Sequence, residues 1–280
     1  IDKYIKIDHN VFWQLFFKSN KKRMTEIKEY AYNLKGSDVK IELNFSEDVF
    51  YPTGTTKALI DAVLKRLDSP GKLLDLGCGS GVLGIVLEKL GLINNSLYAS
   101  DLSQGAVDCS IKNAKMHKIA HDVRVGSLFE PWINEKFDYI VNDVSGVAAG
   151  VAILSPWFKN VPCASGADGT DLVVKVLSEA PNYLSKGGQF FFPVISFSKV
   201  DNILSAANKS FSNITALLRI ANCNSVSKTE DIFFTEQFCW VLHFFLWTMI
   251  FRPSARISFV KNLTVILIDS FDAVPSLYQS

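Results

Sequence analysis

The chain has 280 residues, of which 48% are hydrophobic and 20% charged, and its formal net charge is +1. This composition fits a packed globular protein, and the near-neutral charge provides no global signature of DNA or RNA binding. The five cysteines are scattered and show no Cys-x-x-Cys spacing, so a zinc site or a disulfide framework is not expected.

Residues 1–45 are predicted to form an N-terminal segment that is first helical and then extended. Apolar residues recur at helical spacing over residues 1–35, and residues 39–43 alternate as a strand does. The basic cluster of Lys21, Lys22 and Arg23 is interpreted as a solvated helix start rather than a nucleic-acid contact. We therefore expect a short helical extension before the main domain.

Residues 46–222 are predicted to form one α/β domain. Strands are predicted at residues 73–76, 97–100, 122–125, 138–142 and 189–195, with helical segments between them. This alternation predicts a doubly wound, Rossmann-like parallel sheet with helices on both faces. Ligands of such sheets bind outside the carboxyl ends of the strands. The polar residues expected at those ends are Asp75, Asp101, Ser127 and Asn142.

The most informative motif is the segment 73–81, which reads Leu-Leu-Asp-Leu-Gly-Cys-Gly-Ser-Gly. It predicts a buried strand, a glycine turn and the start of a helix that runs over residues 82–90. Glycines are needed where a strand turns sharply into a helix and a ligand must approach the backbone. A tight structural connection is the alternative interpretation. A second acid favours the ligand site, because Asp101 ends the next strand and is placed to bind the two hydroxyls of a ribose.

Several further segments carry a family resemblance over about residues 49–210. They read Val-Phe-Tyr-Pro-Thr-Gly-Thr-Thr at 49–56, Val-Gly-Ser-Leu-Phe-Glu-Pro at 125–131, Phe-Asp-Tyr-Ile-Val-Asn at 137–142 and Gly-Ala-Asp-Gly-Thr-Asp at 166–171. In this order, with the glycine motif, they resemble the class I S-adenosylmethionine-dependent methyltransferases of the HemK type. That family contains the glutamine methyltransferases of translation release factors.

The resemblance implies a mostly parallel, seven-stranded methyltransferase sheet and S-adenosyl-L-methionine as the cofactor. It also implies methyl transfer to a nitrogen of a protein acceptor such as glutamine (EC 2.1.1.-). The helix expected after the Pro-containing turn spans residues 57–67. The expected cofactor-binding residues are Thr53, Thr55, Asp75, Gly77, Cys78, Gly79, Gly81, Asp101, Leu102, Ser127, Leu128 and Asn142.

The chain departs from the family at the segment where the acceptor is expected to bind. The family has Asn-Pro-Pro-Tyr after the fourth strand, whereas residues 142–145 read Asn-Asp-Val-Ser. The expected catalytic residues are Asn142, which would orient the acceptor nitrogen, and Asp143, which would accept its proton or a hydrogen bond. Two prolines stiffen a loop, so other contacts must hold this one. Two alternatives stay open, namely an RNA base methyltransferase and a catalytically inactive cofactor-binding partner protein.

Residues 223–280 are predicted to form an apolar C-terminal tail, which contains either the last strands of the sheet or aberrant sequence. Residues 213–220 are a candidate sixth strand, and a seventh strand is expected at either 238–245 or 256–268. The apolar run 238–251 is shorter than the roughly 20 residues of a membrane span, so no span is expected. With no leader recognised and reduced-type cysteine usage, we expect a cytoplasmic location.

Overall fold

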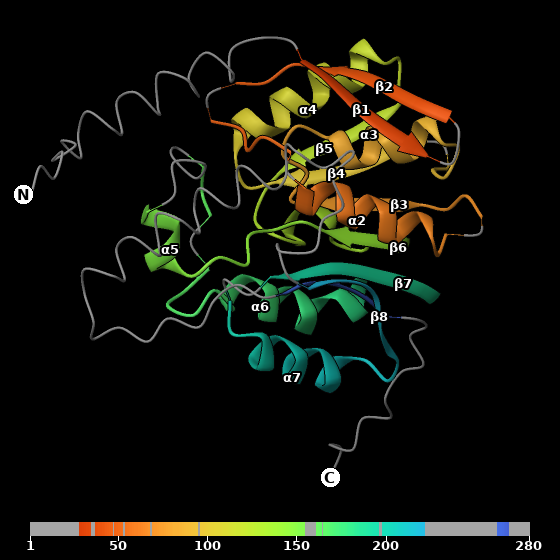
Figure 1. The fold of residues 1–280 in the computed structure, drawn as a ribbon. Helices are drawn as coiled ribbons and strands as arrows, with labels where there is room; N and C mark the ends of the chain where they lie inside the picture. The colour runs from red at the N-terminus through yellow and green to blue at the C-terminus, as the bar shows by residue number, and fades with distance from the viewer. Residues whose placement is uncertain are drawn as a thin grey trace, which may run out of the picture.

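The computed structural model describes residues 28–221 and 262–268, with gaps at 35–36, 47, 53, 68, 95, 155–160, 164 and 196–197. The main sheet contains β3 (Leu73–Leu76), β4 (Leu97–Asp101), β5 (His121–Val125), β6 (Phe137–Asn142), β7 (Leu184–Ile195), β8 (Ile214–Ala221) and β9 (Asn262–Ile268). Its strand order is β5-β4-β3-β6-β7-β9-β8 (Figure 1). The α/β fold predicted from the sequence is confirmed.

The first five strands of this order are parallel, whereas β9 runs antiparallel to both of its neighbours, β7 and β8. The central strand β3 is buried along its whole length, as expected for a sheet that is covered by helices on both faces, whereas the edge strand β5 is only partly buried. Because these strands are parallel, the carboxyl ends of β3, β4, β5 and β6 all lie along one edge. The polar residues predicted at strand ends therefore share that edge.

Helices cover the two faces of the sheet (Figure 1). One apolar core contains residues of α2 (Gly54–Leu64), α3 (Val82–Lys89) and α4 (Gln104–Met116), and the other contains residues of α6 (Asp171–Glu179) and α7 (Val200–Ser210). The short α5 (Ala149–Leu154) follows β6, and two 3₁₀ helices, η1 (Glu130–Trp132) and η3 (Ala180–Tyr183), precede β6 and β7. The helix expected at residues 57–67 thus begins and ends three residues earlier.

The N-terminal segment differs from the prediction. A helix was expected up to residue 35, but Lys28–Leu34 forms strand β1, which pairs antiparallel with β2 (Ser37–Leu43). Tyr30 and Tyr32 alternate along β1, and aromatic residues at alternate positions suit a strand. Helical spacing over so few residues does not distinguish the two structures. The strand predicted at residues 39–43 is confirmed, and residues 1–27 lie outside the described part of the chain.

Strand β7 begins five residues earlier than predicted. Its pairing with β6 is irregular, because Phe137 pairs with Leu184 whereas Tyr139 pairs with Gln189. The extra residues on β7 include Gly187, whose φ of +76° is a left-handed conformation that glycine adopts without strain. Strand β7 therefore passes through a Lys-Gly-Gly segment that resembles a loop in sequence, with an irregular register at that point.

The described parts of the tail complete the sheet. The sixth strand predicted at 213–220 is found as β8, and β9 lies within the candidate range 256–268. The other candidate, 238–245, lies outside the described residues, as does the apolar run 238–251. Among the helices that are described, none has the length and apolar character needed to cross a membrane.

Candidate functional site

The glycine turn is held against the neighbouring strand by backbone hydrogen bonds. The N–H groups of Gly77 and Cys78 both donate to the carbonyl oxygen of Ser100, at 2.8 and 3.1 Å. Gly77 has a φ of +80°, and a Cβ there would lie 2.9 Å from the backbone nitrogen of Val144. Only glycine fits this position, because the turn touches the loop that follows β6.

Gly79 lies at the open side of the same turn. Its φ is +53°, and a Cβ built on it would have no atom within 4 Å. Its N–H donates to Oδ2 of Asp101 at 3.0 Å. The turn therefore presents free space beside the half-buried Gly79, next to an acidic side chain, which is the arrangement expected of a ligand cradle.

Asp101 links the glycine turn to the start of α4. Its Oδ1 accepts the N–H of Ser103 at 2.9 Å, and the Ser103 hydroxyl caps the helix by accepting the N–H of Ala106 at 3.4 Å. Burial raises the pKa of Asp101, and the N–H donors oppose that rise. Each carboxylate oxygen has a second lone pair, so Asp101 retains capacity for further donors. Leu102, the next residue, is 59% exposed at the same edge.

Asp75 lies beneath the turn rather than at its surface. It is 1% exposed, and its Oδ2 accepts the N–H of Gly84 in α3 at 3.2 Å. Burial raises the pKa of Asp75 to about 7, and the negative charge of Asp143 raises it further than the charge of Asp101 does. A carboxyl group is costly to bury in its charged form without a cation nearby.

Asn142 is the last residue of β6 and the least satisfied polar side chain at this edge. It is 1% exposed, and neither its Oδ1 nor its Nδ2 has a hydrogen-bond partner in the described structure. Ile140, two residues earlier, belongs to the core beneath α6 and α7, so strand alternation directs Asn142 to that face. Buried amides are normally paired, so this one is a candidate contact for a ligand.

Asp143 turns to the other face. Its carboxylate Oδ2 accepts the hydroxyl of Thr56 in α2 at 3.3 Å, and its N–H donates to the carbonyl oxygen of Leu76 at 2.9 Å. Burial raises the pKa of Asp143 to about 7, and the hydrogen bond from Thr56 opposes that rise. Thr56 was not among the residues predicted for the site. It is the third residue of α2 and ends the Pro-Thr-Gly-Thr-Thr run that leads into this helix, and that run was the signal for it.

The loop after Asp143 is fixed by contacts that replace the stiffness of two prolines. The Ser145 hydroxyl donates to the carbonyl of Cys163. The N–H of Ser165 donates to the carbonyl of Val147 at 3.2 Å, and that of Ala149 to Gly166 at 2.9 Å. Sequence reasoning did not identify Cys163 or Ser165, because both are about 20 residues away along the chain.

The remaining predicted residues are distributed around the same edge. Ser127 and Leu128 follow β5, and Leu128 is buried with a φ of +50°. Cys78 is buried in the turn, where burial raises the pKa of its thiol well above the ordinary value, so the thiol stays protonated. Thr55 lies in the first turn of α2, Gly81 precedes α3 with a φ of +77°, and Thr53 lies outside the described residues.

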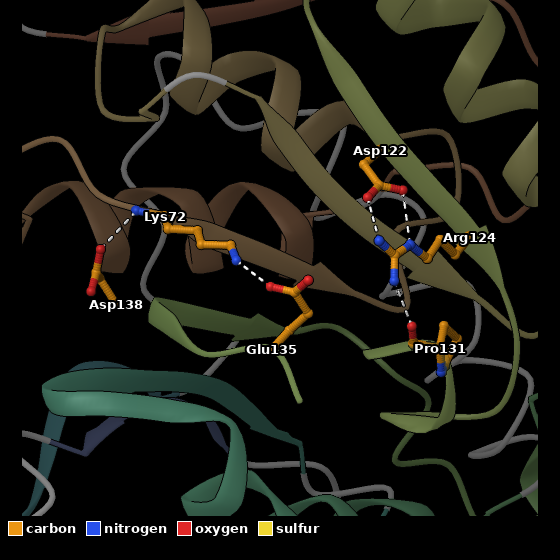
Figure 2. A network of polar contacts seen from close by, with 6 residues as sticks. All are labelled: Lys72, Asp122, Arg124, Pro131, Glu135 and Asp138. Carbon is orange, nitrogen blue, oxygen red and sulfur yellow. Dashed lines mark hydrogen bonds and ion pairs between the residues drawn. The ribbon is translucent and has the colours of Figure 1, made fainter. Parts of the chain in front are cut away.

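Polar groups at the amino-terminal ends of β3 and β6, and a second group within and after β5, are paired among themselves (Figure 2). The backbone N–H of Lys72 donates to Asp138 at 2.9 Å, and its ammonium group forms an ion pair with Glu135. Arg124 forms two hydrogen bonds with Asp122 and one with the carbonyl of Pro131. The charges in these two groups neutralise each other, whereas no ion pair among the described residues includes Asp75, Asp101 or Asp143 at the carboxyl edge.

Residues 45–143 match the family model described as methyltransferase small domain. A release factor glutamine methyltransferase of Geobacter sulfurreducens is 31% identical over 145 residues, which are 50% of this chain and 51% of that protein. A ribosomal protein L11 methyltransferase of Thermosipho melanesiensis is 28% identical over 164 residues, 58% and 53% of the two chains. The chain spans about half the length of these curated relatives. These matches confirm the methyltransferase domain that the sequence motifs predicted, with S-adenosylmethionine as the cofactor of the family.

Solved structures share the fold. A T. thermophilus 16S rRNA N2 G1207 methyltransferase in complex with AdoMet and guanosine aligns with a TM-score of 0.56 at 14% identity, over 94% of this chain and 63% of that one. A methyltransferase from Pyrococcus furiosus aligns with a TM-score of 0.52 at 12% identity, over 93% and 99%. At these identities the likeness concerns the fold alone, which is that of a methyltransferase.

Proposed function

We propose that this chain transfers a methyl group from S-adenosylmethionine to a nitrogen atom of a protein acceptor. The observation that carries the proposal is the Asn142 side chain, which is 1% exposed at the carboxyl edge of the sheet with both amide atoms unpaired. The methyltransferase small domain over residues 45–143 supports the reaction class. The catalytic unit in this proposal is the domain at residues 46–222, to which the tail adds strand β9.

The residues at this edge fit the cofactor. The free space beside Gly79 suits the backbone approach of its amino-acid part, and Asp101 retains lone-pair capacity for a ribose hydroxyl. Leu102, Ser127 and Leu128 would flank the adenine. When bound, the cofactor supplies a methyl group on an electrophilic sulfonium. The protein then has to align the acceptor with that methyl group and exclude water.

Asn142 would position the acceptor. Its Oδ1 can accept an N–H of the acceptor, which directs the nitrogen lone pair away from the side chain and toward the methyl group. A glutamine amide has two N–H groups, and the second would donate to the backbone carbonyl of Asp143. Relatives named as methyltransferases of release factors and ribosomal proteins support a protein acceptor.

The test is incubation of a cell extract with the purified chain and cofactor labelled in its methyl group, followed by separation of protein from RNA. We expect label in a protein with the wild type and none above background with Asn142→Ala. Label in RNA would instead support an RNA base methyltransferase. Cofactor binding without labelling of either pool would identify a catalytically inactive partner protein, and both results would overturn the proposal.

A further inference from the structure

Asn142 and Asp143 are consecutive, yet they lie on opposite faces of the sheet. Asn142 follows the register of Ile140 toward the core beneath α6 and α7. The carboxylate of Asp143 instead meets the Thr56 hydroxyl of α2 and lies close enough to Asp75 for its charge to act on that carboxyl. The two side chains therefore do not point at the same ligand group. If Asn142 binds the acceptor, the carboxylate of Asp143 has a different role.

Asp143 adjoins the glycine turn. Its N–H donates to the carbonyl of Leu76, the residue immediately before the turn. Gly77 packs so closely on the next residue, Val144, that a Cβ at Gly77 would lie 2.9 Å from the Val144 nitrogen. The amino-acid part of a cofactor held by the turn would thus lie beside Asp143.

Among the described residues, no ion pair compensates the carboxyl groups at this place. In the described part of the chain, ion pairs join Lys72 to Glu135, Arg124 to Asp122, and Lys175 to Glu179, and none includes Asp75, Asp101 or Asp143. Buried carboxylates are normally paired, because losing hydration without a partner is costly. A ligand cation would supply the missing charge.

We propose that Asp143 binds the primary ammonium group of the cofactor's amino-acid part. A primary ammonium carries three N–H donors and no acceptor, which suits a carboxylate whose described donor is the single hydroxyl of Thr56. The inference rests on the proposed function, since it presumes that S-adenosylmethionine binds at the turn. The HemK-type family that the chain resembles has a proline at this position. Because proline has no charged side chain, the proposed contact would distinguish this chain from that family.

The experiment compares ligands with and without the ammonium group. Calorimetry measures binding of S-adenosylhomocysteine, which has the amino-acid part, and of methylthioadenosine, which lacks it, to the wild type, Asp143→Asn and Asp108→Asn. For Asp143→Asn we expect S-adenosylhomocysteine affinity to fall by about 10- to 100-fold, the size of one charge-assisted hydrogen bond. Methylthioadenosine affinity should change by less than about 2-fold. Asp108, an exposed residue of α4 that bonds Gln104, is the matched control and should alter neither affinity.

The outcomes separate this inference from the proposed function. Unchanged methylthioadenosine binding demonstrates that Asp143→Asn is folded, and a selective loss of S-adenosylhomocysteine binding supports the ammonium contact. Equal losses for both ligands, or no loss for either, would overturn the contact while the wild type still bound the cofactor product. If the wild type bound neither ligand, the proposed function itself would fail.

Discussion

The Gly79 N–H and the Asp101 carboxylate are joined by a 3.0 Å hydrogen bond between the glycine turn and the end of the adjacent strand. One carboxylate thus fixes the turn through Oδ2 and the start of α4 through Oδ1. The two residues are 22 positions apart in the sequence, with helix α3 and most of strand β4 between them. Their contact makes the turn and the acid parts of one site.

Replacing Asp101 by Ala should weaken cofactor binding by about 1–3 kcal/mol, because the ribose hydroxyls lose a charged acceptor. Calorimetry with S-adenosylmethionine measures the loss, and methylthioadenosine should show a similar loss because it carries the same ribose. Asp108→Ala, on the exposed side of α4, is the control. An affinity equal to that of the wild type would remove Asp101 from the site.

Gly79 and Gly91 form a matched pair for testing the turn. Both have left-handed backbones, with φ values of +53° and +74°, and a Cβ at either has no atom within 4 Å. Ala at each position should therefore cost a similar backbone strain of about 1–2 kcal/mol. Only Gly79→Ala should lower cofactor affinity, by at least about 10-fold, because its methyl group would occupy the space of the ligand. Equal affinities of the two variants would make the turn a purely structural connection.

Asn142→Leu should separate activity from stability. The unpaired buried amide costs free energy in the ligand-free protein, so a leucine should leave the free energy of unfolding equal to or above that of the wild type. Methyl transfer should fall by orders of magnitude, because the acceptor loses its alignment. Denaturant unfolding and a transfer assay measure the two effects.

Asn113→Leu provides the contrasting control. Asn113 is also buried, but its amide donates to the carbonyl oxygens of Ser80 and Asn44 at 2.9 and 3.1 Å. Its replacement should lower the free energy of unfolding by about 1–3 kcal/mol, because it leaves those carbonyls unpaired. Similar destabilisation by both substitutions would show that Asn142 is a structural residue.

Two carboxyl groups whose pKa values are raised to about 7 predict an unusual pH dependence. Asp75 and Asp143 titrate near 7 in the folded protein and near 3.8 when unfolded, so the folded state binds more protons between these values. Their contribution to stability is therefore full below about pH 4 and is lost as the pH rises through about 7. Denaturant unfolding between about pH 4.5 and about pH 8 covers most of the range between the unfolded and folded pKa values. Over this range, the free energy of unfolding should change less with pH for Asp143→Asn than for the wild type. Superimposable profiles would contradict the raised pKa of Asp143.

The sequence by itself determined the order of strands and helices and the edge at which the site lies. Apolar runs at residues 73–76 and 97–100 and the glycines after Leu76 specify local conformations, because they depend on neighbours in the chain. Asp75, Asp101 and Asn142 could be assigned to one edge because parallel strands align their carboxyl ends. The helix expected over Lys28–Leu34 was wrong, since its strand conformation depends on pairing with β2.

Only the tertiary structure decided what each polar side chain meets. The sequence does not reveal which groups surround the side chains of Asn142 and Asp143. The two side chains lie on opposite faces of the sheet, and different helices cover those faces. The hydrogen bond between Asp143 and Thr56 joins residues 87 positions apart. The hydrogen bond from the Ser145 hydroxyl to the Cys163 carbonyl joins residues 18 positions apart. A hydrogen bond requires its two heavy atoms to lie about 3 Å apart, and the residue types alone do not give the distance between atoms that are far apart in the chain. The unpaired amide and the uncompensated carboxylates therefore became visible only in the folded chain.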